Sequence, residues 1–208
     1  MVKFISSFFS VILTTFVIGL PQAKAQVIVG GVLEENTVYH AELNPYIVTE
    51  SVEIPEGLTL TIEPGVQILF MVRTSIVVNG GVLIASGTQE YPIQFASRTS
   101  NEKWNGLNFK GSRALFDDEG NYEGGNIVKF ASIQQSTSAF VLSDSASVLI
   151  DSTSIFNCEY GITMQSGSSM YFKNSSIEQC SFGVSIKNSA NNVIRNCTIN
   201  QCDIGIFF

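Results

Sequence analysis

The sequence has few charged residues, and basic residues are the scarcer kind. Charged residues make up 14% of the chain, with 11 Lys and Arg against 18 Asp and Glu. This shortage of basic side chains argues against binding nucleic acid by long-range attraction. Histidine and tryptophan each occur once. The single histidine, His40, has no neighbouring Ser or Cys constellation, so we interpret it as a surface or cap residue rather than a general base.

The longest apolar run lies at the amino terminus. It covers residues 4–20 after a basic start, and an Ala-Lys-Ala sequence follows at 23–25. This pattern predicts a signal peptide over 1–25. No later stretch is apolar enough to cross a bilayer, so we expect a secreted or cell-surface protein without membrane insertion. Removing Lys3 and Lys24 leaves nine basic residues against 18 acidic ones, a net charge of −9.

A leucine-rich consensus and a helical pattern are both missing, although the chain repeats every 22 residues from Asn126 onward. Each unit has apolar residues at fixed offsets, together with a small residue and a glycine in the clearest units. The units are Val128, Ile133, Ser136, Ala139, Phe140 and Leu142; Ile150, Ile155, Cys158, Gly161, Ile162 and Met164; Phe172, Ile177, Cys180, Gly183, Val184 and Ile186; and Ile194, Ile199, Cys202, Gly205, Ile206 and Phe208. The alternation in 162–164 and 184–186 predicts strands, which bury their apolar faces only when the units stack.

These observations predict an all-β fold, a parallel β-helix whose regular 22-residue coils cover 126–208. Residues 26–125 are rich in short strands and turn residues, and we expect them to form a cap and the first irregular coils. The last unit stops at Phe208, 16 residues into its period. We therefore expect either the front part of a longer protein or a coil end that another chain covers, which includes self-association.

The segment before the repeat contains "PYIVTESVEIPEGLTLTIEPGVQILF", "IVVNGGVLIASGTQEYPIQF" and "WNGLNF". Over residues 44–208 the chain resembles bacterial secreted right-handed parallel β-helix proteins of the pectin-lyase-like fold. The most specific motifs are Gly-x-Thr-Leu-x-Ile-x-Pro-Gly-Val and Gly-x-Leu-x-Ala-x-Gly-Thr. The resemblance implies a fold and an extracellular habit. It implies no reaction, because that family includes lyases, hydrolases, adhesins and members without demonstrated chemistry.

The recurring small residues are expected to serve folding. Gly161 and its equivalents in later coils should turn with a positive φ or let the next coil approach closely. Asn174 and Asn196 are one period apart and should form an inward amide ladder. The repeat should also stack three of the four cysteines, and Cys197 takes another slot. An even number in an exported chain also suits disulfides, but parallel stacking favours free buried thiols for Cys158, Cys180 and Cys202.

Carboxylates on neighbouring coils would indicate a polysaccharide-cleaving enzyme. The register gives none: Asp151 is followed one period later by Lys173 and then Arg195. We expect this column to form an outward ion pair with an extra cation, and we consider it a candidate binding site. Trp104 could line a sugar-stacking surface or pack against the coil.

The acidic loop over 117–123 is the remaining candidate. Ca²⁺ prefers oxygen-rich loops, so Asp117, Asp118 and Glu123 could hold this ion, although an exposed acidic turn explains them equally simply. No other cofactor is indicated. Our leading hypothesis is a noncatalytic extracellular scaffold that binds glycan or another cell-surface component. The alternative is a polysaccharide lyase or glycoside hydrolase whose active coils are missing or use other residues.

Overall fold

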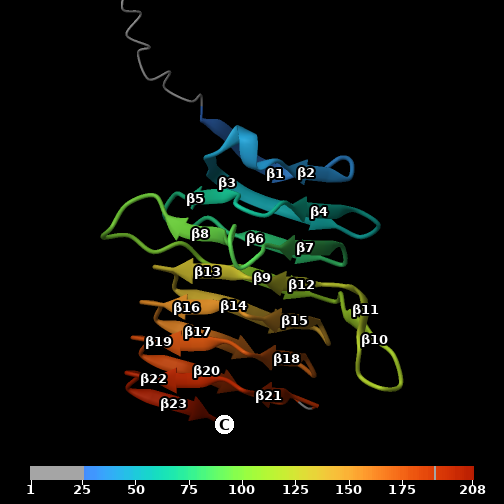
Figure 1. The fold of residues 1–208 in the computed structure, drawn as a ribbon, viewed down its shortest axis with the longest axis vertical. Helices are drawn as coiled ribbons and strands as arrows, with labels where there is room; N and C mark the ends of the chain where they lie inside the picture. The colour runs from blue at the N-terminus through green and yellow to red at the C-terminus, as the bar shows by residue number, and fades with distance from the viewer. Residues whose placement is uncertain (1–25, 190) are drawn as a thin grey trace, which may run out of the picture.

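The computed structural model describes residues 26–189 and 191–208, and it is a solenoid of parallel β-strands (Figure 1). The seven-stranded sheet contains β2 (Thr37–Tyr39), β4 (Thr59–Ile62), β7 (Val82–Ser86), β12 (Ile127–Lys129), β15 (Ser147–Asp151), β18 (Ser169–Lys173) and β21 (Val193–Arg195). The predicted signal peptide lies outside the described residues. Within them, no helix is long and apolar enough to cross a membrane.

A 14-stranded sheet supplies the other two sides of the solenoid. One arm contains β5 (Gln67–Phe70), β8 (Ile93–Ser97), β13 (Ala131–Gln134), β16 (Ser154–Phe156), β19 (Ser176–Glu178) and β22 (Thr198–Asn200). The other contains β6 (Ile76–Asn79), β9 (Leu107–Lys110), β14 (Ser138–Ser143), β17 (Tyr160–Met164), β20 (Phe182–Ile186) and β23 (Ile204–Phe207). The long strand β3 (Tyr46–Pro55) pairs with β5 and β6 and so joins the two arms.

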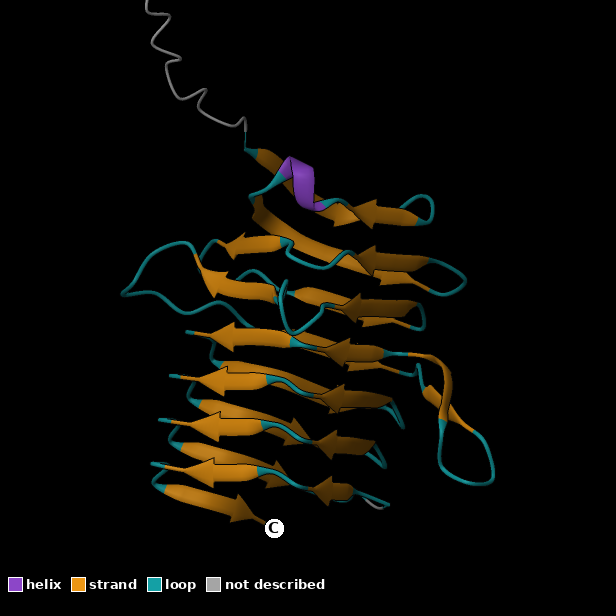
Figure 2. Ribbon diagram, viewed as in Figure 1, coloured by secondary structure: helices purple, strands orange, loops and turns teal. Residues whose placement is uncertain are grey.

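Few elements depart from this plan. Strand β1 (Val27–Val32) pairs with β3, and a single turn of 3-10 helix, η1 (Ala41–Leu43), follows β2. It is the only helix in the described part of the chain (Figure 2). Strands β10 (Ala114–Phe116) and β11 (Tyr122–Gly125) form an antiparallel hairpin that projects from the coils.

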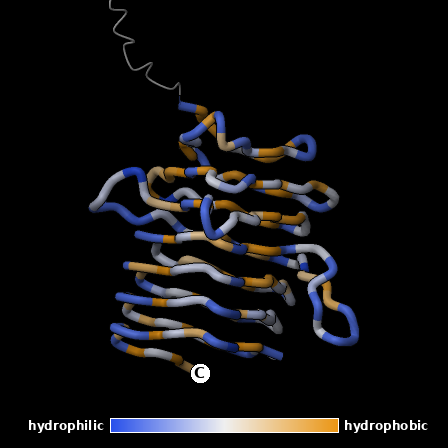
Figure 3. The backbone as a smooth tube through the Cα atoms, in the orientation of Figure 1, coloured by the Kyte–Doolittle hydropathy of each residue, from blue (hydrophilic) through white to orange (hydrophobic). Residues whose placement is uncertain are grey.

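The 22-residue register is confirmed at each position tested. Phe172 pairs with Ile150 on one side and with Ile194 on the other. In the β5 arm Ile177 likewise pairs with Ile155 and Ile199. Each strand alternates inward apolar and outward polar residues, so equivalent side chains stack about 4.8 Å apart into continuous columns. The polar turns and the hydrophilic tip of the β10–β11 hairpin are visible in Figure 3.

The prediction for the repeated glycine is half right. Gly161 does not have a positive φ, but a Cβ there would lie 2.5 Å from the Gly183 carbonyl oxygen and 2.7 Å from Ile177 Cγ2. Close approach between coils is therefore its role. Non-glycine residues make the left-handed turns instead, in two columns one period apart. The columns are Phe130, Ser152, Asn174 and Asn196, and Gln135, Asn157, Gln179 and Gln201.

Insertions between coils explain the irregular first half. Ile84 pairs directly with Ile127, so the chain between them leaves the solenoid and returns. Asn126 closes this excursion: its side chain is fully buried, accepts a bond from the Leu83 amide at 3.0 Å, and donates to Ser112 Oγ at 2.8 Å and to the Ser147 carbonyl at 3.2 Å. The buried amide thus satisfies backbone groups that the interrupted ladder leaves unpaired.

Candidate functional site

A groove of about 630 Å³ follows the turn between the seven-stranded sheet and the β5 arm. Each coil bends sharply here, because a left-handed residue separates the last strand residue of one sheet from the first residues of the next. The turn residues Ser152, Asn174 and Asn196 form one wall. Residues 88–92 close the groove at its amino-terminal end, where Thr88, Gln89 and Pro92 contribute to the lining.

The opposite wall is a column of hydroxyl groups. Ser154, Ser176 and Thr198 lie in register on β16, β19 and β22, and each lines the groove. Their side chains are exposed or half-buried, and no other described residue forms a hydrogen bond with these hydroxyl groups. By contrast, the floor residues Thr153 and Ser175 are buried and bond to backbone atoms. The wall hydroxyl groups therefore remain available to a ligand.

The amide ladder exists, but it faces outward rather than inward. Asn196 Nδ2 donates to Asn174 Oδ1 at 3.3 Å, and Asn174 Nδ2 donates to Asp151 Oδ1 at 2.9 Å. Both asparagines are exposed because they occupy left-handed turn positions at the surface, a conformation that Asn tolerates well. This correction places amide groups on the groove wall.

Comparison with protein-family models matches residues 97–208 to the right-handed β-helix region family. The match covers more than half of the chain and coincides with the coils that contain the groove. The chain belongs to the right-handed β-helix family. Neither the comparison with curated proteins nor that with solved structures gave a match. Family and fold support a scaffold or carbohydrate-related role in general.

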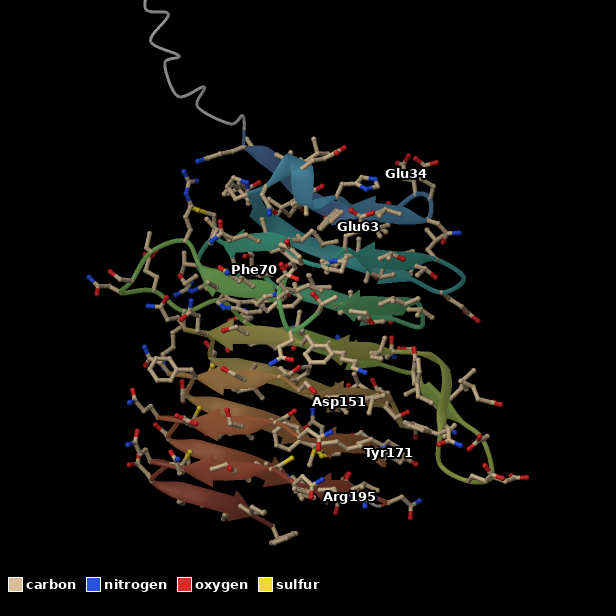
Figure 4. All side chains as sticks on the ribbon, viewed as in Figure 1. Glu34, Glu63, Phe70, Asp151, Tyr171 and Arg195 are labelled. Carbon is tan, nitrogen blue, oxygen red and sulfur yellow. The ribbon has the colours of Figure 1, made fainter. Side chains whose placement is uncertain are left out.

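The charged column of the β-helix runs beside the groove, and its pairing differs from the prediction. Asp151 Oδ2 lies 3.8 Å from Lys129 Nζ, one coil earlier, and not against Lys173. Among the described residues, no carboxylate lies within salt-bridge distance of Lys173 or Arg195. Figure 4 shows Asp151 and Arg195 on successive levels of the same side, with Tyr171 between them. Two cations thus flank the turn without acidic partners.

Trp104 has no exposed face for a sugar. Its ring is fully buried and stacks on Phe70 with centroids 3.8 Å apart, while its Nε1 donates to the Gln134 carbonyl at 2.9 Å. The packing alternative was right and the sugar-stacking prediction was wrong, because this β-helix uses the indole to fill the interior where an insertion widens the coil. The aromatic residue that lines the groove is Phe130, which the sequence reading did not single out.

The acidic hairpin loop is held together by its own backbone. Asp117 Oδ1 accepts bonds from the amides of Glu119 at 3.0 Å and Asn121 at 2.7 Å, and Oδ2 accepts one from Asn121 Nδ2 at 2.9 Å. These bonds lower the pKa of Asp117 below its ordinary value. No group of three or more His, Cys, Asp or Glu residues in the described ranges is arranged to hold a metal. Calcium binding by Asp117, Asp118 and Glu123 stays a prediction.

The four cysteines of the β-helix are free thiols. Cys158 and Cys180 are each 3% exposed, whereas Cys197 and Cys202 are half-buried. The hydrogen-bonded Cys158 thiol and burial raise the pKa of Cys180. Cys180 should therefore be a poor nucleophile, because the thiolate is the reactive form.

We expect a thiol reagent under native conditions to modify Cys197 and Cys202 well before the two buried cysteines. Quenched labelling at increasing times, followed by peptide mass spectrometry, measures the order. In denaturant all four cysteines should react at similar rates, which provides the control. Labelling of Cys180 as fast as Cys202 in the native protein would contradict the assigned burial.

Proposed function

We propose that this β-helix is an exported, noncatalytic scaffold that binds a polysaccharide or a similar cell-surface polymer along its groove. The observation that carries the proposal is the repetition of one set of polar groups, Ser154, Ser176 and Thr198, on successive coils beside the Asn174 and Asn196 amides. A stacked coil presents the same group every 4.8 Å or so, which suits a ligand that is itself a repeating chain of hydroxyl groups.

The export and the extracellular location belong to the same proposal. They are supported by the basic start and apolar run of residues 1–25, and the likeness to pectin-lyase-like proteins is supported by the motifs within 44–208. Self-association through the last coil stays a prediction. In that coil Ile204, Ile206 and Phe207 are 38%, 42% and 52% exposed.

The noncatalytic reading is supported by the composition of the groove. Its lining residues are Ser, Thr, Asn, Gln, Pro, Ala and Phe, so no carboxylic acid or histidine of the described chain lines it. Glycoside hydrolysis of the usual kind needs a pair of acids about 5–10 Å apart. A lyase or hydrolase activity remains the alternative, and release of reducing ends or unsaturated products from pectin or alginate, with and without Ca²⁺, would support it.

A bulky residue in the groove wall tests the binding site. We expect Ser176→Trp to abolish binding to a polysaccharide array, because an indole at the centre of the hydroxyl wall occupies the groove. Ser185→Trp is the matched control: it lies in the same coil, is similarly half-buried, and faces outward from β20 away from the groove. Equal binding by both variants and the unsubstituted protein would overturn the assignment of this groove.

A further inference from the structure

We infer that Phe130 is the contact platform for an uncharged sugar chain at the closed end of the groove. The inference rests on the proposed function and deepens it, because it names both the class of ligand and the residue that contacts it. Three observations support it: the backbone conformation of Phe130, its position in the groove, and the charge of the residues around it.

Phe130 occupies a backbone conformation that suits it poorly. Its φ is +46°, in the left-handed region, where the later coils of the same column have Ser152, Asn174 and Asn196. Asn adopts this conformation readily, whereas a bulky aromatic residue rarely does. Strained residues of this kind gather at ligand sites, where the side chain is retained despite its cost to folding. An asparagine would satisfy the turn, so the turn itself does not require an aromatic ring.

The ring lies where the groove ends against an insertion. Phe130 and Pro92 both line the groove there, and the Phe130 carbonyl accepts a hydrogen bond from the Ile93 amide at 3.0 Å, which holds the insertion close. The side chain is half-buried, with Lys129 Nζ 5.2 Å from the ring centroid. A half-buried ring next to a row of hydroxyl and amide groups offers both surfaces that a sugar needs, one for its CH groups and one for its hydroxyl groups.

The groove is uncharged along its whole lining. The nearest basic residue in sequence, Lys129, is engaged with Asp151 at 3.8 Å. The chain as a whole is acidic, with a formal net charge of −7. An acidic polymer would approach against this charge and would find no cation in the groove, whereas a neutral sugar chain meets neither obstacle. A neutral ligand is therefore favoured over an acidic one.

The test combines a ligand panel with a substitution that the turn should accept. Calorimetric titration of the protein with cellohexaose, mannohexaose, maltohexaose and hexagalacturonate should give binding for at least one neutral oligosaccharide and none for the acidic one. Phe130→Asn should weaken that binding by about tenfold or more, as truncation of an aromatic anchor does, while the melting temperature stays the same or rises because Asn suits the left-handed turn.

Phe156→Asn is the control for loss of an aromatic ring. Phe156 is 37% exposed on the outer face of β16 and does not line the groove, so this variant should keep full affinity. Unchanged affinity in Phe130→Asn, or a loss of equal size in Phe156→Asn, would overturn the inference. Binding of hexagalacturonate alone would overturn the neutral-ligand inference and leave the proposed function standing. Binding of none of the four probes would overturn both.

Discussion

Gly161→Ala is expected to destabilise the protein by about 3 kcal/mol, at the upper end of the cost of overpacking a core. The added methyl group would lie 2.5 Å from the Gly183 carbonyl oxygen and 2.7 Å from Ile177 Cγ2. The first of these atoms belongs to the backbone of the next coil and cannot move without breaking the ladder between β17 and β20. The midpoint of urea denaturation measures the effect.

Gly124→Ala is the matched control for this substitution. Gly124 lies in the projecting hairpin, has no positive φ, and has no atom within 4 Å of an added Cβ. Alanine there should change the free energy of unfolding by less than about 0.5 kcal/mol, as is usual for surface substitutions. If Gly161→Ala and Gly124→Ala unfolded at the same urea concentration, close approach could not be the reason for glycine in this column.

Asn126→Leu should cost about 3–5 kcal/mol, the second large effect. Leucine has a similar volume but cannot replace the three hydrogen bonds, so the Leu83 amide and the Ser147 carbonyl would be left buried without a partner. Each such group costs about 1–3 kcal/mol. Denaturation measures the total, and hydrogen exchange should show loss of protection at the Leu83 amide.

Asn108→Leu provides the comparison for this second substitution. Asn108 is half-buried on the outer face of β9, and its side chain forms no hydrogen bond with another described residue. Its replacement should leave stability nearly unchanged. A stable Asn126→Leu variant with a protected Leu83 amide would mean that the excursion between β7 and β12 is closed by other contacts.

The regular coils could be predicted from the sequence because their period is constant. With 22 residues between equivalents, Ile150, Phe172 and Ile194 align without knowledge of the structure, and the pairing of β15, β18 and β21 confirms the alignment. The first coils gave no such register, because insertions such as the one between Ile84 and Ile127 change the spacing from coil to coil. Strand identity could be read there, but strand partners could not.

The details of the site depended on geometry that a period alone does not contain. The repeat places Asp151 and Lys173 one coil apart, yet the side chain of Asp151 reaches back to Lys129 instead. It also placed the asparagine ladder inside, because nothing in the period reports the sharp left-handed bend that turns Asn174 and Asn196 outward. The unusual residue in that column, Phe130, could have been noticed as the one aromatic among Ser and Asn residues.

The parallel stacking of the coils has a consequence for how the molecule folds. In the regular part every strand pairs only with its equivalents in the coils before and after it, as β18 pairs with β15 and β21. Folding can then spread from coil to coil once a few neighbouring coils have formed, because each finished coil offers a template edge for the next. The Phe130 turn lies where the insertions give way to the regular coils, so the slowest step of that spread is expected close to the groove.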